Sequence, residues 1–97
     1  MQLLSSADFA SQANTSYELW LGDGAMNLTL VDIRPLPAAA HAGSMRQPFS
    51  LIFRSSVRHV LPQRTYQLKN AASGVQEVFL VPVGRDAAGV LYEAIFN

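Results

Sequence analysis

The chain is 97 residues long, which predicts one domain over residues 1–97 with a single hydrophobic core. Basic and acidic side chains number 7 each, and a net charge of zero argues against a whole-domain surface for nucleic acid or an acidic membrane. The absence of cysteine excludes disulfides, thiolate catalysis and cysteine metal sites.

Charged residues make up 14% of the chain and hydrophobic residues 49%. The charged share is low against an average of about 25%, so much of the surface must be neutral or apolar. This favours a protein that meets a partner or associates with itself. A monomer whose surface is rich in serine, alanine, glutamine and asparagine remains the alternative.

The N-terminal residues 1–10 lack the basic start and the long apolar run of a signal peptide. No window approaches the roughly 18–20 apolar residues of a membrane-spanning helix. We therefore expect a cytoplasmic protein that has no contact with a membrane.

A short helix is predicted over residues 5–13. Ser5 or Ser6 can accept hydrogen bonds from its first turn, and Asp8 suits the positive end of the helix dipole. About nine residues are too few for a helix that stands alone in water, so we expect it to dock on a sheet through Leu4 and Phe9.

Residues 17–21 and 25–33 alternate between apolar and polar side chains, which predicts two strands. The turn residues 22–24, Gly-Asp-Gly, join them into a hairpin. Trp20 should face outward, as a partner anchor or packed beneath the short helix. The side chains expected to face inward are Tyr17, Leu19, Leu21, Met26, Leu28 and Leu30.

Pro35 and Pro37 should end the second strand, because proline cannot donate to a strand ladder. Residues 38–46 are predicted to form an exposed connection. A third strand follows over residues 47–54, with Phe49, Leu51 and Phe53 in the core and Ser50 and Arg54 outside. A loop over 55–62, a short strand over 65–68 and a turn over 69–74 complete the middle of the chain.

The C-terminal residues 75–97 predict a second hairpin, in which the polar segment 85–89 forms a longer loop. Phe79, Val81 and Val83 lie on one face of its first strand, and Val78 and Leu80 lie on the other. A strand that is apolar on both faces is usually covered on both sides. Pro82 should lie at an edge or at a bulge, and residues 90–96 form the closing strand.

The predicted fold class is therefore mostly β: a small six-stranded antiparallel barrel or sandwich with one short N-terminal helix. Closure into a barrel is attractive because it removes edges that would otherwise template aggregation.

No pattern of catalytic or metal-binding residues is visible, so we expect neither an enzyme nor a cofactor. His41 and His59 lie in predicted loops and form no closely spaced pair. The loop Gly-Asp-Gly lacks the spacing of a phosphate-binding or calcium-binding loop.

Glu93 is the most informative acidic residue, because it interrupts the apolar closing strand. In a hairpin it would stand near Val81 or Leu80. It should form an ion pair with Arg54 or Arg64, and a ligand-binding carboxylate is the alternative.

Basic residues cluster around the third and fourth strands, close to Tyr66, and could face an oligonucleotide. They are Arg54, Arg58, Arg64 and Lys69. Net neutrality argues against that use, and we expect no nucleic-acid partner.

The motifs P-F-S-L-I-F-R, L-P-Q-x-T-Y, V-F-L-V-P-V-G-R-D and L-Y-E-A-I-F-N resemble those of a family of small bacterial proteins classed as a domain of unknown function. The resemblance covers residues 4–97 and is most specific over residues 48–97. Arg64 departs from the family's usual glycine. The family has no assigned activity and no catalytic residues. Its association with tail-collar-like fibre proteins implies an assembly role in a phage-tail-like or surface-fibre system.

The sequence thus predicts a non-enzymatic module for protein–protein contact or homo-oligomer formation. The alternative is a small-molecule or carbohydrate-binding barrel with a pocket lined by Trp20, Tyr66, Tyr92 and Glu93. The residues expected to contact a partner or ligand are Trp20, Arg54, Tyr66, Tyr92 and Glu93.

Overall fold

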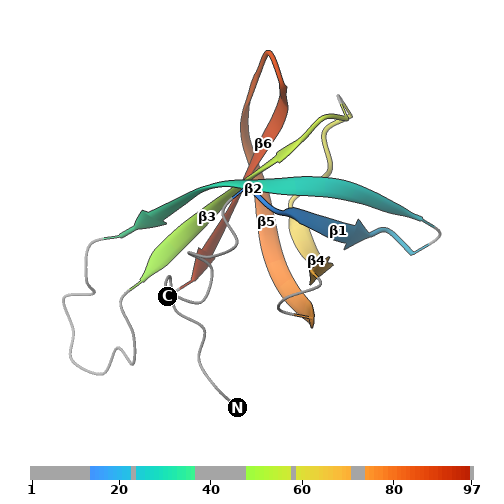
Figure 1. Ribbon diagram of the computed structural model, residues 1–97, viewed down its shortest axis with the longest axis horizontal. Coiled ribbons are helices and arrows are strands. Elements are labelled where there is room, and N and C mark those ends of the chain that lie inside the picture. The colour runs from blue at the N-terminus through green and yellow to red at the C-terminus, as the bar shows by residue number, and fades with distance from the viewer. Residues whose placement is uncertain (1–13, 23, 37–47, 58, 71–73, 97) are drawn as a thin grey trace.

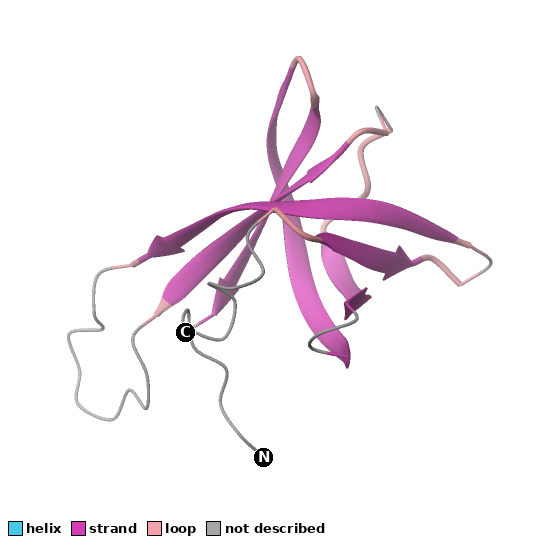
Figure 2. Ribbon diagram, in the orientation of Figure 1, coloured by secondary structure: helices cyan, strands magenta, loops and turns pink. Residues whose placement is uncertain are grey.

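Six antiparallel strands form the described part of the protein in the computed structural model (Figures 1 and 2). The structure describes residues 14–22, 24–36, 48–57, 59–70 and 74–96. The strands are β1 (Ser16–Trp20), β2 (Ala25–Pro35), β3 (Phe49–Ser55), β4 (Arg64–Asn70), β5 (Gly74–Asp86) and β6 (Gly89–Phe96). The helix predicted over residues 5–13 and the connection predicted over 38–46 lie outside the described residues.

The strands close into a barrel in the order β1-β2-β3-β6-β5-β4. Closure is made by β1, which pairs with β2 on one side and with β4 on the other. Leu19 stands opposite Met26 of β2 and opposite Leu68 of β4. The sequence left barrel and sandwich open, and this second pairing of β1 decides for the barrel.

Alternation along the strands builds the core. Inward side chains from all six strands are buried, and the predicted inward positions Leu19, Leu28, Leu30, Phe49, Leu51 and Phe53 are each at most 1% exposed. Tyr17 meets Phe53 edge to face at 5.3 Å between ring centroids, and Phe49 stacks on Phe96 at 4.9 Å. The first contact joins β1 to β3 across the core, and the second lies along the ladder between β3 and β6, in which Phe49 stands opposite Phe96.

The β5–β6 hairpin confirms the predicted bulge. The register shifts between Pro82 and Gly84, which leaves Val83 as the extra residue of β5. A proline is tolerated there because the ladder is interrupted. On the side of the bulge away from the turn, Val81 stands opposite Glu93, as predicted.

The turn of this hairpin is tighter than predicted. Only Ala87 and Ala88 separate the strands, since Asp86 pairs with Gly89. Gly89 has a φ of 152°, and a side chain there would collide with the carbonyl oxygen of Ser55. Glycine therefore lets the hairpin lie directly against the end of β3.

Three predicted orientations need correction. Ser50 is fully buried although alternation places it on the outer face of β3, where the neighbouring Ile52 is also buried. Leu21 is 41% exposed because β1 ends at Trp20. The outer face of β5 is not covered, since Phe79 and Val83 are 50% and 51% exposed.

Candidate functional site

The five residues predicted to contact a partner or ligand do not form one site. Trp20 lies on β1, Arg54 on β3 and Tyr66 on β4, while Tyr92 and Glu93 are neighbours on β6. Because adjacent residues of a strand face opposite sides, Tyr92 points into the core and Glu93 points outward. Their surroundings define three separate places on the barrel.

The first place is a shallow hollow at the pairing of β1 with β4, which we call the seam hollow. It has a volume of about 400 Å³ and is lined by Trp20, Leu21, Gly22, Arg64, Thr65, Tyr66 and Gln67. Trp20 stands opposite Gln67 in the ladder and is 45% exposed, which confirms that its side chain faces outward. An exposed indole beside a guanidinium, a hydroxyl and an amide could hold a flat or ring-shaped polar ligand.

The second place is the end of the barrel, where two tyrosine hydroxyls hold the segment after β3. Tyr66 donates a hydrogen bond to the carbonyl oxygen of Pro62 at 2.6 Å, and the backbone N–H of Leu61 donates to the hydroxyl oxygen of Tyr92 at 3.0 Å. Leu61 is thereby held in the core at 6% exposure. Both tyrosines serve the fold, and Tyr92, which is 1% exposed, does not line the hollow beside Trp20.

Burial raises the pKa of the Tyr66 hydroxyl. The nearby guanidinium of Arg64 acts in the opposite direction, because a positive charge favours the phenolate. The hydroxyl therefore remains protonated at neutral pH and stays able to donate to Pro62.

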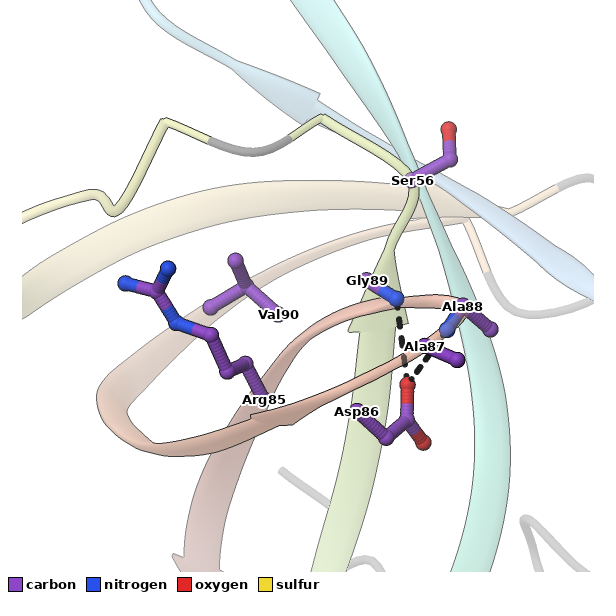
Figure 3. Close-up of a pocket in the computed structure, with 7 residues that line it drawn as sticks. All are labelled: Ser56, Arg85, Asp86, Ala87, Ala88, Gly89 and Val90. Carbon is purple, nitrogen blue, oxygen red and sulfur yellow. Dashed lines mark hydrogen bonds between the residues drawn. The ribbon is translucent and has the colours of Figure 1, made fainter.

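The third place is the tip of the β5–β6 hairpin, where a cleft of about 340 Å³ separates the turn from Ser56 (Figure 3). The carboxylate of Asp86 organises this tip. Its Oδ1 accepts hydrogen bonds from the N–H groups of Ala88 and Gly89 at 2.9 and 3.0 Å. Its Oδ2 accepts from the guanidinium of Arg54 at 2.8 Å.

The hydrogen bond from Arg54 lowers the pKa of the Asp86 carboxyl, and those from the Ala88 and Gly89 backbone act in the same direction. Asp86 is consequently ionised at neutral pH and ties β5 to β3 across the intervening β6. Sequence reasoning missed this residue. The signal was available, because an aspartate three residues before a glycine is a common side-chain cap of a turn.

The ion pair expected between Glu93 and Arg54 or Arg64 does not form. In the part of the chain that the structure describes, the ion pairs are Arg54–Asp86 and Arg34–Asp32. Glu93 is half-buried on the outer face, between Ile52 of β3 and Val81 of β5. Its predicted role in ligand or partner contact stays a prediction.

The described residues contain no group of three histidine, aspartate or glutamate side chains that could hold a metal ion. His59 is exposed, and His41 lies outside the described residues. Within the same residues, no helix is long and apolar enough to cross a membrane.

Replacing Tyr92 with phenylalanine should destabilise the protein more than replacing Tyr66 does. Y92F leaves the buried N–H of Leu61 without its acceptor, which costs about 1–3 kcal/mol. Y66F removes a donor from the carbonyl of Pro62, an exposed residue that water can reach, so its cost should be smaller. Urea unfolding of both variants measures the difference, and a Y92F midpoint at or above that of Y66F would contradict the assigned role of Tyr92.

The comparisons with known proteins agree with the resemblance seen in the sequence. No curated protein and no solved structure matches this chain. A family model described as a domain of unknown function, DUF6916, matches residues 4–96. The chain therefore belongs to the DUF6916 family.

Proposed function

We propose that this barrel is a non-enzymatic module that holds a protein partner, or a second copy of itself, through outward-facing side chains. The observation that carries the proposal is that three apolar side chains of β5 are exposed by half or more. Val75 is 59% exposed, Phe79 50% and Val83 51%, and we call these residues the β5 strip.

The neighbours of the β5 strip suit a protein contact. Thr65 of β4 stands opposite Phe79, and Lys69 stands opposite Val75. Glu77 is exposed between Val75 and Phe79 on the same face. Apolar side chains with polar and charged residues beside them are common in protein interfaces. Burying a phenylalanine side chain completely contributes about 1.5–3 kcal/mol, so Phe79 is the natural anchor.

Barrel closure restricts how a partner can bind. Partners often add a strand to an exposed sheet edge, and closure leaves little of any edge free, because each of the six described strands pairs with two neighbours, each along part of its length. Outward-facing side chains therefore offer the larger surface for contact. An interface of standard size covers about 800 Å² on each partner, so one face of a barrel with 6163 Å² of accessible surface is large enough.

The finer part of the proposal is that the module belongs to a bacterial assembly of the phage-tail-like or surface-fibre type. It rests on the family resemblance of the C-terminal motifs. A module of this kind needs a rigid scaffold with an adhesive outer face, and it needs no catalytic group.

Replacing Phe79 with serine should abolish association while leaving the fold intact, because the side chain lies outside the core. The measurement is solution mass by light scattering over a concentration series, alone and with extract of the native host, followed by retention of proteins on the immobilised domain. We expect wild type to form oligomers or to retain a defined protein, and F79S to lose that association.

Val57 provides the matched control, because its side chain is 45% exposed and it does not belong to β5. V57S removes a comparable exposed apolar group and should associate like wild type. A wild-type protein that stays monomeric and retains no protein would contradict the proposal. If V57S and F79S lost association equally, the β5 strip would not be the contact surface.

A small-molecule or carbohydrate-binding function is the second candidate, and the seam hollow favours it. Trp20 presents an indole face, while Arg64, Thr65 and Gln67 supply hydrogen-bonding groups beside it. Sugar rings commonly combine aromatic stacking with hydrogen bonds of this kind.

Trp20 is the single tryptophan of the chain, so its fluorescence reports directly on this hollow. Under the second candidate, titration with neutral and acidic mono- and disaccharides should give a saturable change that Q67A weakens several-fold. R34A, which alters an exposed position on β2, serves as the control. Titrations that never saturate at millimolar sugar would exclude this candidate for the sugars tested.

A further inference from the structure

We propose that a groove at the tip of the β5–β6 hairpin binds a short acidic segment of a partner protein, with a carboxylate on Arg85 and a neighbouring aliphatic side chain in the hollow beside it. This inference rests on the proposed function and names one contact that the partner makes. The groove is the union of two hollows, and we call it the hairpin groove.

The two hollows meet at Arg85 and Val90. The cleft on one side, of about 340 Å³, runs along the turn from Asp86 to Gly89 and reaches Ser56. The hollow on the other side, of about 210 Å³, is bounded by Val60, Pro82 and Gly84. Arg85 and Val90 stand opposite each other in the ladder and line both hollows. Figure 3 shows them in the first of the two.

The charges of the groove favour an anion. Arg85 is exposed, and its guanidinium has no ion pair or hydrogen bond with any residue that the structure describes. The carboxylate of Asp86, by contrast, already accepts hydrogen bonds from Arg54, Ala88 and Gly89. Arg54 and Asp86 therefore neutralise each other, and Arg85 leaves a net positive charge at the tip. The fork of an arginine can bind a carboxylate through two parallel hydrogen bonds.

The other half of the groove is apolar. Val60 is 38% exposed, Val90 forms the floor, and Pro82 offers a ring without an N–H. Gly84 lines this half without contributing a side chain. Adjacent side chains of a fully extended chain point to opposite sides, so a bound segment must bend here to place an aliphatic side chain in this half and the carboxylate of the next residue on Arg85.

The shape favours a polypeptide over a small acid. Pockets for small molecules usually bury about 70–90% of the ligand surface. These hollows instead lie open along the β5–β6 hairpin, which projects from the barrel in Figure 1. A free carboxylic acid would remain largely in water. A polypeptide that bends over Arg85 can fill both halves and continue across the surface on either side.

Fluorescence anisotropy of the full chain with a labelled peptide, Ser-Val-Glu-Val-Glu-Ser, tests the inference. We expect saturable binding that weakens as salt is raised, because the central contact is an ion pair. The peptide with both glutamates replaced by glutamine should bind about tenfold more weakly, and R85Q should weaken the acidic peptide by a similar factor.

Arg34 gives the matched control, because it is an exposed arginine on β2 that pairs with Asp32 away from the hairpin. R34Q removes the same charge and should bind like wild type. The reversal R85E should reject the acidic peptide and bind Ser-Val-Lys-Val-Lys-Ser instead. Far-ultraviolet circular dichroism confirms that each variant is folded.

Equal binding of the acidic and glutamine peptides, or an R85Q variant that binds like wild type, would overturn the inference. Competition by free isovalerate at the affinity of the peptide would also overturn it, since the groove would then be a small-acid site. These results are separable from the proposed function, because the F79S and V57S measurements test association through the β5 strip without reference to Arg85. If F79S lost association but the acidic peptide did not bind, the proposed function would stand and only the hairpin groove would be excluded as a binding site.

Discussion

The pairing of β1 with β4 is the constraint on which the rest of the structure depends. The ladder from Glu18–Lys69 to Trp20–Gln67 joins the first strand to the fourth and turns a six-stranded sheet into a barrel. It closes the core around Leu19 and Leu68, which are 0% and 2% exposed. It also creates the seam hollow, whose lining comes from the ends of these two strands. Because closure occupies most of the strand edges, side chains on the outer surface and at the ends offer the larger surface for contact with other molecules.

The β5–β6 hairpin is held to the barrel by a second set of contacts at its tip. Gly89 lies directly against Ser55, and Asp86 receives Arg54 from β3. The tip is therefore a braced projection in which the side chain of Arg85 is left to face solvent. In physical terms the protein presents a stable scaffold with an apolar strip on one face and a positive groove at one end. The proposed role in assembly rests on that combination.

Local patterns predicted most of the fold. Alternation located the strands, and Pro82 predicted the bulge, because both follow from rules that act within a few residues. Non-local choices could not be obtained in this way. The partner of Arg54 is Asp86, which the sequence placed in a loop, and the burial of Ser50 contradicts its position on the outer face. The composition of residues 85–89 predicted a longer loop. The turn is tight because the carboxylate of Asp86 accepts hydrogen bonds from the N–H groups of Ala88 and Gly89, and composition alone does not reveal those contacts. Of the candidate site residues, Trp20 was correctly predicted to lie on the surface. Tyr92 instead lies in the core, where its hydroxyl accepts a hydrogen bond from the backbone N–H of Leu61.

Native-state hydrogen exchange measured by nuclear magnetic resonance tests closure of the barrel most directly. If β1 pairs with both neighbours, the amides of Glu18–Trp20 and Gln67–Lys69 that take part in the ladder should be protected to a degree close to that of the β3–β6 ladder. An open sheet would leave the edge amides of β1 and β4 exchanging at nearly the rate of an unfolded chain. That result would contradict the barrel, and an exposed strand edge would then be available for a partner to bind.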